Sequence, residues 1–176
     1  MKGMYYFAYG SNLHPARLRE RAPGARVVAR ALLRGHELRF HKRGRDGSGK
    51  CDAWTTGASR DLVHGVIYRI SARERHRLDQ VEGVGQGYDR VQLRVSARGR
   101  CRVVFAYLAR PAAIVSDLQP YGWYLDYLLC GARYHGLPGR YVKGISRIPR
   151  LRDLSSARRR RHRGVIARHV RPAQSP

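Results

Sequence analysis

The hydrophobic residues of the chain fall into short clusters separated by polar and glycine-rich segments, a pattern typical of alternating strands and helices. The first cluster, residues 4–8, is aromatic and apolar and is soon followed by Gly10, so it predicts a buried strand. The polar, glycine-rich residues 43–50 predict a loop. Further strands are predicted over residues 26–33, 36–41, 62–70, 92–95 and 102–108.

Helices are predicted by residues that start and stop them. Ser71 and Glu74 have the spacing of a capping box, in which the serine accepts a backbone N–H and the glutamate reaches back to the cap. This helix is expected to end at Gly83, because glycine suits the left-handed position after a helix. Two more helices are expected, a short one that begins at Pro15 and a longer one over about residues 120–134.

The charge of the chain is strongly positive and unevenly placed. Its 176 residues are enough for one domain with its own core, and 36 Lys and Arg against 12 Asp and Glu give a net charge of +24. Such a charge favours contact with anions, among them small acids, nucleic acids and acidic membrane faces. Residues 150–176 contain nine arginines and one acid. We therefore expect a folded domain over residues 1–149 and an arginine-rich C-terminal tail, mobile or loosely helical, over residues 150–176.

The cysteines and histidines show no metal-binding or disulfide pattern. Cys51, Cys101 and Cys130 are odd in number and lack C-x-x-C spacing, so neither a disulfide framework nor a zinc site is expected. The apolar run over residues 4–9 is too short for a signal peptide, and no segment has the length of a membrane span. These features predict a cytoplasmic protein without a metal ion.

Glu82 has an unusual position for a carboxylate. It lies at the C-terminal end of its predicted helix, where the helix dipole disfavours a second negative charge. A carboxylate in such a field, partly buried beside Val81 and Val84, is poised to take and return a proton near neutral pH. The same position also suits an exposed glutamate before a C-cap glycine, so the residues alone leave both interpretations open.

Residues 9–12, Tyr-Gly-Ser-Asn, form a second candidate element. Gly10 follows a buried strand and precedes a helix, so backbone N–H groups there can converge on an anion or a carbonyl oxygen. Ser11 and Asn12 add side-chain donors. The alternative is a simple strand-to-helix turn in which Asn12 caps the helix.

Five short segments, each a weak signal alone, together form a strong signal because they follow a definite order along the chain. They are residues 5–13 (YYFAYGSNL), 65–68 (GVIY), 78–84 (LDQVEGV) with Gly87 and Tyr88, Tyr124 with 130–132 (CGA), and 136–138 (GLP) with Tyr141. This ordered set covers about residues 4–145 and resembles the γ-glutamylcyclotransferase family. The resemblance and the element pattern predict a mixed α/β (α+β) fold, with a small curved or barrel-like sheet flanked by helices.

The resemblance implies a cofactor-independent enzyme whose catalytic domain is residues 1–149. The family's reaction closes the γ-glutamyl group of a small-molecule substrate into 5-oxoproline and releases the amine that was attached to it. Glu82 matches the general acid/base of the family, and Asn12 points to the branch that acts on γ-glutamyl amino acids or to a close bacterial relative of that branch. The matching substrate-binding positions are Tyr6, Ala8, Tyr9, Gly10, Ser11, Asn12, Tyr88 and Tyr124.

The positive charge supports a different class of function. The domain would then be a basic binding module for nucleic acid or an acidic partner, with an idle cyclotransferase site. Arginine runs bind phosphates, but nonspecific binding of this kind weakens steeply with salt. A solvated tail is the simpler alternative, in which case any anion binding by residues 150–176 is weak and nonspecific.

Overall fold

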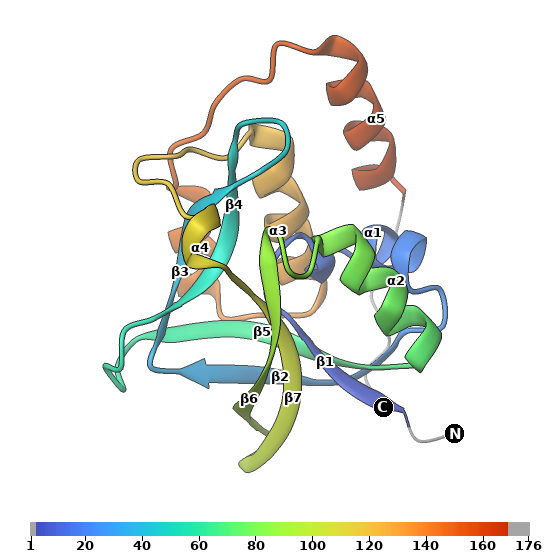
Figure 1. Cartoon of the computed structure of the whole chain (residues 1–176), viewed down its shortest axis with the longest axis vertical. Helices are drawn as coiled ribbons and strands as arrows, with labels where there is room; N and C mark the ends of the chain where they lie inside the picture. Colours follow the sequence, from blue (N-terminus) through green and yellow to red (C-terminus); the bar gives the residue numbers. More distant parts are fainter. Residues whose placement is uncertain (1–2, 169–176) are drawn as a thin grey trace.

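A closed five-stranded barrel forms the centre of the protein. The computed structural model describes residues 3–168 (Figure 1). The strands follow the order β1-β5-β2-β6-β7 around the barrel. Their bounds are β1 Met4–Ala8, β2 Arg26–Arg34, β5 Leu62–Ile70, β6 Tyr88–Ala97 and β7 Arg100–Ala109. The predicted mixed α/β fold with a barrel-like sheet is confirmed.

The barrel closes between its first and last strands. β1 runs antiparallel to β5 and parallel to β7, where Tyr6 pairs with Phe105. β2 pairs along its length with β5 and meets β6 at Leu32 and Ser96. This closure brings β1 next to β7.

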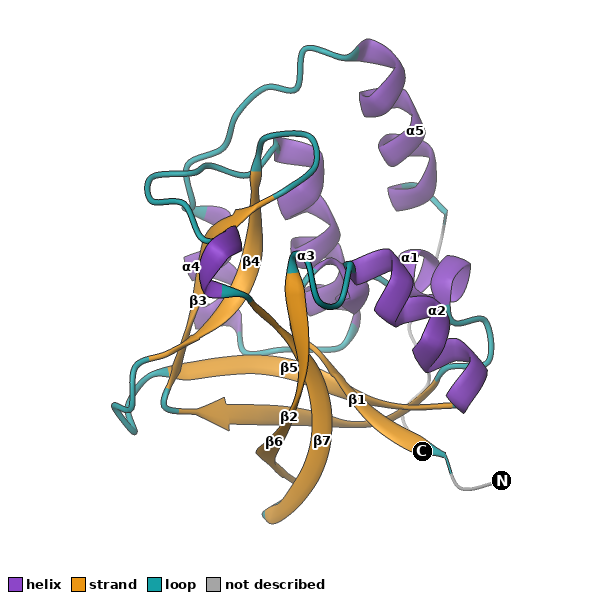
Figure 2. Ribbon diagram, viewed as in Figure 1, coloured by secondary structure: helices purple, strands orange, loops and turns teal. Residues whose placement is uncertain are grey.

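A separate hairpin of β3 (His36–Arg43) and β4 (Gly49–Thr55) stands beside the barrel (Figure 2). The predicted loop over residues 43–50 is therefore wrong at both ends, and β4 has no counterpart among the predicted strands. The buried residues of β4 include Cys51, Asp52 and Ala53, which are small or polar, so the strand lacks a hydrophobic pattern. The turn over residues 44–48 joins the two strands.

Helices cover one end of the barrel. They are α1 Pro15–Arg21, α2 Ala72–Glu82, α3 Gly122–Tyr134, α4 Gly139–Ser146 and α5 Ser156–Ile166, with short 3-10 turns η1 Ser11–Leu13 and η2 Pro111–Ala113. The capping box of α2 is present, since Ser71 Oγ accepts from the backbone N of Glu74 and Glu74 Oε2 accepts from that of Ser71. Gly83 ends the helix in the left-handed conformation, with φ 68°. No helix within residues 3–168 is long and apolar enough to cross a membrane.

The central helix α3 fixes the segment that follows β1. Its Leu125, Tyr127 and Leu128 are fully buried. Gly131 lies against η1, and a Cβ on this glycine would come within 2.4 Å of the carbonyl carbon of Leu13. A glycine is required for this close approach, which holds residues 11–13 against the helix.

Helix α5 packs on α3 through buried polar and aromatic contacts. His162 stacks on Trp123 with ring centroids 3.7 Å apart, and burial lowers the pKa of His162 to about 4. Asp153 is buried and accepts hydrogen bonds from Trp123 Nε1 and Arg158. Residues 156–166 are thus a docked helix, whereas residues 169–176 of the predicted tail lie outside the described residues. The division at residue 149 stays a prediction.

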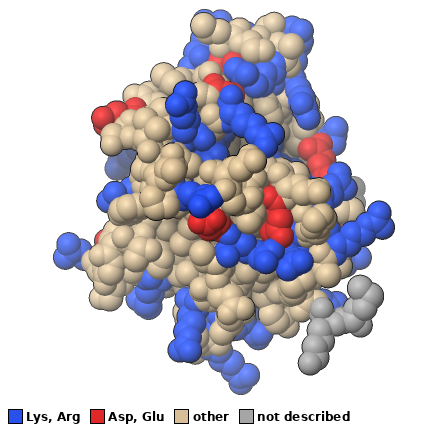
Figure 3. Space-filling model, in the orientation of Figure 1, with Lys and Arg blue, Asp and Glu red and all other residues tan. Residues whose placement is uncertain are grey.

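Basic side chains are spread over the surface. Figure 3 shows Lys and Arg side chains across the whole face in view, with more of them around α5 at its top, and few acidic groups between them.

Candidate active site

Two adjoining cavities lie where η1, the end of α2 and the start of β6 meet. The inner cavity has a volume of about 30 Å³, and the outer one, about 410 Å³, opens to solvent. Ser11, Glu82, Tyr88 and Tyr124 line both cavities, so these residues mark the place where the two adjoin.

Glu82 is held at this junction by two hydrogen bonds. Its Oε1 accepts from Asn12 Nδ2 at 3.0 Å and from Arg21 Nη1 at 2.8 Å. The Glu82 side chain is 18% exposed and that of Arg21 is 17% exposed, so water screens this ion pair only partly. Arg21 supplies a positive charge close to the negative end of α2, where a carboxylate is otherwise disfavoured. Glu82 is therefore a fixed, mostly buried residue that lines both cavities, and not a solvated residue before a helix cap.

Asn12 connects the Tyr-Gly-Ser-Asn loop to this carboxylate. Besides its bond to Glu82, its Nδ2 donates to the Tyr6 hydroxyl at 2.9 Å, and its Oδ1 accepts from Arg21 Nη1 at 2.8 Å. The alternative in which Asn12 caps the helix is wrong, because the N-cap of α1 is His14, whose Nδ1 accepts from the backbone N of Arg17. Asn12 is fixed by three side chains that come from β1, α1 and α2.

Cys51 on β4 positions two tyrosines of the site. Its backbone N donates to the Tyr124 hydroxyl at 3.1 Å, and its backbone O accepts from the Tyr88 hydroxyl at 2.8 Å. Its Sγ lies against Gly10, where a Cβ would come within 2.4 Å of the sulfur. Burial raises the pKa of the Cys51 thiol to about 12, so the sulfur is a neutral packing group and not a nucleophile.

The tyrosine hydroxyls around the inner cavity are neutral. Burial raises the pKa of Tyr6, Tyr88 and Tyr124 well above the ordinary value, and the charge of Glu82 adds to this effect. Phenols in this state donate hydrogen bonds at any physiological pH.

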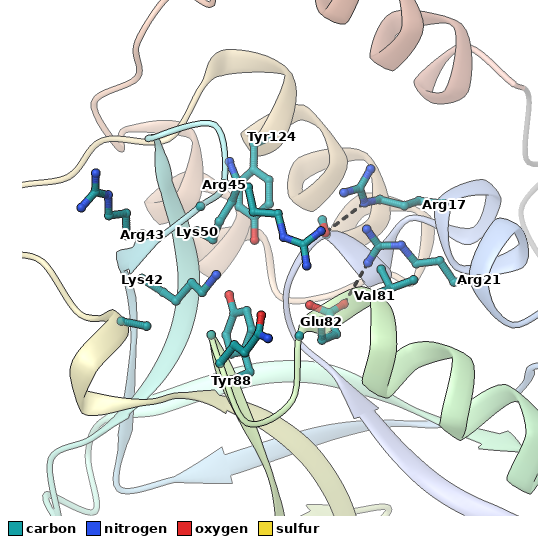
Figure 4. A pocket seen from close by; sticks show the side chains of 16 residues that line it. Arg17, Arg21, Lys42, Arg43, Arg45, Lys50, Val81, Glu82, Tyr88 and Tyr124 are labelled. Carbon is teal, nitrogen blue, oxygen red and sulfur yellow. Dashed lines mark hydrogen bonds and ion pairs between the residues drawn. The ribbon is translucent and has the colours of Figure 1, made fainter.

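Six basic side chains surround the outer cavity (Figure 4). They are Arg17, Arg21, Lys42, Arg43, Arg45 and Lys50. In Figure 4 Arg17 and Arg21 extend from α1 on one side, Lys42 extends from β3 on the other, and Arg45 lies between them. Within residues 3–168, no three His, Cys, Asp or Glu side chains gather closely enough to hold a metal ion. The site thus combines one carboxylate, neutral hydroxyl donors and a basic entrance.

Known proteins are similar to this chain in both sequence and fold. The profile of the AIG2-like family matches residues 62–145. A γ-glutamylcyclotransferase from Mus musculus is 30% identical over 151 residues, which span 81% of this chain and 77% of the mouse protein, and the Homo sapiens enzyme is 28% identical over the same shares. A solved structure of a γ-glutamyl cyclotransferase superposes with a TM-score of 0.80 over 93% of this chain and 99% of its own, at 24% identity. The chain belongs to the γ-glutamylcyclotransferase family.

The residues that the resemblance singled out converge on one place in this family member. Glu82 and all the predicted substrate-binding residues except Ala8 line the inner cavity. Ala8 is buried in the core together with Tyr6, and its backbone oxygen lies against Gly65, where a Cβ would come within 2.5 Å. Gly65, one of the family-like positions, is thus explained by strand packing. The roles of the lining residues stay predictions.

Several residues that line the two cavities could not be identified from the sequence around them. Cys51, which shows no disulfide or zinc pattern in the sequence, lines the inner cavity, as does Tyr107, whose hydroxyl donates to Asp79 Oδ1 at 2.9 Å. Arg21 reaches Glu82 across 61 residues of sequence. The one available hint was the four-residue spacing of Arg17 and Arg21, which places both on the same face of a short helix.

Proposed function

We propose that the protein is a γ-glutamylcyclotransferase, which converts a γ-glutamyl amino acid or a related γ-glutamyl amide into 5-oxoproline and a free amine. The observation that carries this proposal is the hydrogen bond between Glu82 and Asn12. It joins the one carboxylate among the described residues that line the inner cavity to the loop that resembles the family's substrate loop. Membership of the family supports the same reaction, as do the mouse and human relatives, which are γ-glutamylcyclotransferases.

The chemistry is an intramolecular aminolysis. The α-amine of the γ-glutamyl group attacks the side-chain carbonyl carbon of the same group, which forms the ring C–N bond and a tetrahedral oxyanion. The oxyanion then collapses, the bond to the leaving nitrogen breaks, and the amine departs. Because both reacting groups belong to one molecule, holding the substrate in a folded conformation supplies much of the rate.

Glu82 provides both proton transfers in this scheme. Among the hydrogen bonds of residues 3–168, those to Glu82 end on Oε1, which leaves Oε2 for the substrate. Oε2 takes one proton from the substrate ammonium before the attack and returns it to the leaving nitrogen, while the ring nitrogen loses its second proton to water as the lactam forms. Arg21 and Asn12 keep the carboxylate in place during this exchange, and general acid/base catalysis of this kind contributes about 10²–10⁴-fold.

Neutral hydrogen-bond donors around the inner cavity can stabilise the negative charge that develops on the carbonyl oxygen. The backbone N–H groups of residues 10–12 and the hydroxyls of Tyr6 and Tyr124 are the candidates in this proposal. Because burial keeps these phenols protonated, they can stabilise a negative charge without carrying one.

The proposal is tested by incubating the purified protein with γ-glutamyl amino acids, γ-glutamylamines and glutathione. Mass spectrometry then measures 5-oxoproline and the released amine. We expect the two products in equal amounts. Release of glutamate in place of 5-oxoproline would indicate a hydrolase and contradict the proposal.

The structure gives less support to the second function, binding of nucleic acid or an acidic partner by the arginine-rich tail. Arg158 and Arg159 of this tail contact Asp153, so they help to dock α5. Binding of nucleic acid by residues 150–176 stays a prediction, which a salt titration of DNA binding with and without these residues tests. Binding that persists at physiological salt and disappears on truncation would support it.

A further inference from the structure

The outer cavity has far more positive than negative charge. Six Lys and Arg side chains line it, and among its described lining residues Glu82 is the one carboxylate. Two of the six have acidic partners. Arg21 pairs with Glu82 at 2.8 Å, and Lys50 pairs with Asp46 at 2.9 Å. These pairs neutralise part of the charge only.

The other four cations have no carboxylate within ion-pair distance among residues 3–168. They are Arg17, Lys42, Arg43 and Arg45. Arg17 donates through Nε to the neutral Ser11 Oγ at 3.0 Å and lies over the Tyr127 ring at 4.4 Å. Arg43 and Arg45 flank the turn between β3 and β4 and are exposed to solvent. Arg43 points away from the cavity in Figure 4, so about three unpaired positive charges, those of Arg17, Lys42 and Arg45, face one opening.

Lys42 is the most constrained of these cations. The residue is only 9% exposed, and its Nζ lies 4.8 Å from the centre of the Tyr88 ring. Gly87 leaves it room, because a Cβ there would come within 2.8 Å of Nζ. Burial lowers the pKa of Lys42, whereas the charge of Glu82 acts in the opposite direction. A nearly buried ammonium without a paired carboxylate is costly, and an anion in the cavity would offset that cost.

The position of Glu82 determines which part of the substrate meets these charges. In the proposed reaction the amide that breaks lies beside Glu82, where the inner and outer cavities adjoin. The glutamyl group is held by the loop and the tyrosines on the inner side. The leaving amine then extends into the outer cavity, between Lys42 and the arginines of α1 (Figure 4).

We infer, on the basis of the proposed function, that the natural leaving amine carries at least two negative charges, which the unpaired cations of the outer cavity bind. The chemical class is a γ-glutamyl conjugate of an acidic amine, with the charges supplied by carboxylates or by a phosphate. An amine with one carboxylate uses only part of this site, and a neutral amine uses none of it.

The test compares substrates that differ only in the charge of the leaving amine. γ-Glutamyl-alanine releases an amine with one carboxylate, γ-glutamyl-glutamate one with two, and γ-glutamyl-O-phosphoserine one with a carboxylate and a phosphate. We expect the wild-type kcat/KM to be at least about tenfold higher for the two acidic conjugates than for γ-glutamyl-alanine, since charge-assisted hydrogen bonds are the strong ones. The ratio between the two acidic conjugates identifies the preferred anion.

Matched variants separate the site from the general charge of the protein. Arg45→Gln and Lys42→Met should each reduce the preference for acidic conjugates about tenfold. Arg94→Gln on β6 removes the same charge from an exposed position outside the cavity and should leave the preference unchanged. Arg45 is exposed, so its variant remains informative if replacement of the buried Lys42 impairs folding.

The outcomes distinguish this inference from the proposed function. Equal kcat/KM for γ-glutamyl-alanine and both acidic conjugates would overturn the inference and leave the cyclotransferase proposal intact. A preference that Arg94→Gln reduces as much as Arg45→Gln would also overturn it, because the effect would then come from net charge. Absence of 5-oxoproline from every substrate would overturn both.

Discussion

Replacing Gly10 with alanine places a methyl group where the sulfur of Cys51 already lies. The new Cβ would be 2.4 Å from Sγ, whereas ordinary contacts begin at 3.4 Å, so the loop and β4 must move apart by about 1 Å. The backbone of Gly10 has φ −105° and ψ −145°, and the next nearest atom, the Tyr124 hydroxyl, is 3.7 Å away. The clash therefore comes from one atom.

The expected cost of Gly10→Ala follows from that displacement. Overpacking of this kind destabilises a protein by about 1–3 kcal/mol, and 2 kcal/mol lowers the Tm of a chain of this size by about 4–8 °C. The shift also moves the loop relative to Glu82. A misplacement of about 1 Å at a catalytic site reduces the rate by about 10²-fold.

A double-mutant cycle with Cys51→Ala tests the cause. Removing Sγ makes room for the new methyl group, so the double variant should be more stable than the sum of the single variants predicts, by about 1–2 kcal/mol, and should recover part of the 5-oxoproline release. Gly144→Ala in α4 is the control, because its Cβ meets no atom within 4 Å. Additive effects in the cycle, or a Gly10→Ala protein as stable and active as the wild type, would refute the reasoning.

Two further predictions concern stability. Asp153→Asn should lower the free energy of unfolding at pH 7 by about 1.5–3 kcal/mol, measured by urea denaturation, because it breaks the partly buried pair with Arg158 that docks α5. Arg158 holds the pKa of Asp153 well below its usual range, so this difference should shrink as the pH falls below about 4; a constant difference would contradict the assignment. Burial lowers the pKa of His135 to about 4, so the unfolded chain binds a proton between pH 6.5 and 4 that the folded protein does not. The free energy of unfolding should therefore fall by about 1–2 kcal/mol between pH 7 and 5 because of His135. His135→Gln should remove this part of the pH dependence.

The parts of the fold that were predicted correctly are those with local signals. The apolar run of β1, the capping box at Ser71 and Glu74, and Gly83 at the end of α2 each involve neighbours within a few residues. The strand β4 was not predicted because the residues that contact and bury it are distant from it in the sequence. Asp52, for example, accepts from His41 Nε2 at 2.9 Å and from the backbone N of Ala109 at 2.8 Å. No hydrophobic period marks such a strand.

The residues of the candidate site also fall into two groups, those predicted from local sequence and those brought in by tertiary contacts. Glu82 and the loop over residues 9–12 were identified from short segments and their order along the chain. Arg21 and Cys51 reach the site only through tertiary contacts, 61 residues from Glu82 and 73 residues from Tyr124 respectively. Helix α4 begins at Gly139 after a proline and contains a second glycine, so its sequence indicates a break and not a helix.

The most direct test of the account is the kcat of Glu82→Gln for 5-oxoproline release, with the γ-glutamyl compound that the wild type converts fastest. Glutamine keeps the oxygen that accepts from Asn12 and Arg21, so the variant should fold with a Tm close to that of the wild type. It cannot take or return a proton, and its kcat should fall by about 10²–10⁴-fold. A folded Glu82→Gln protein that retains a kcat within about threefold of the wild type would contradict the role of Glu82, and with it the proposed mechanism.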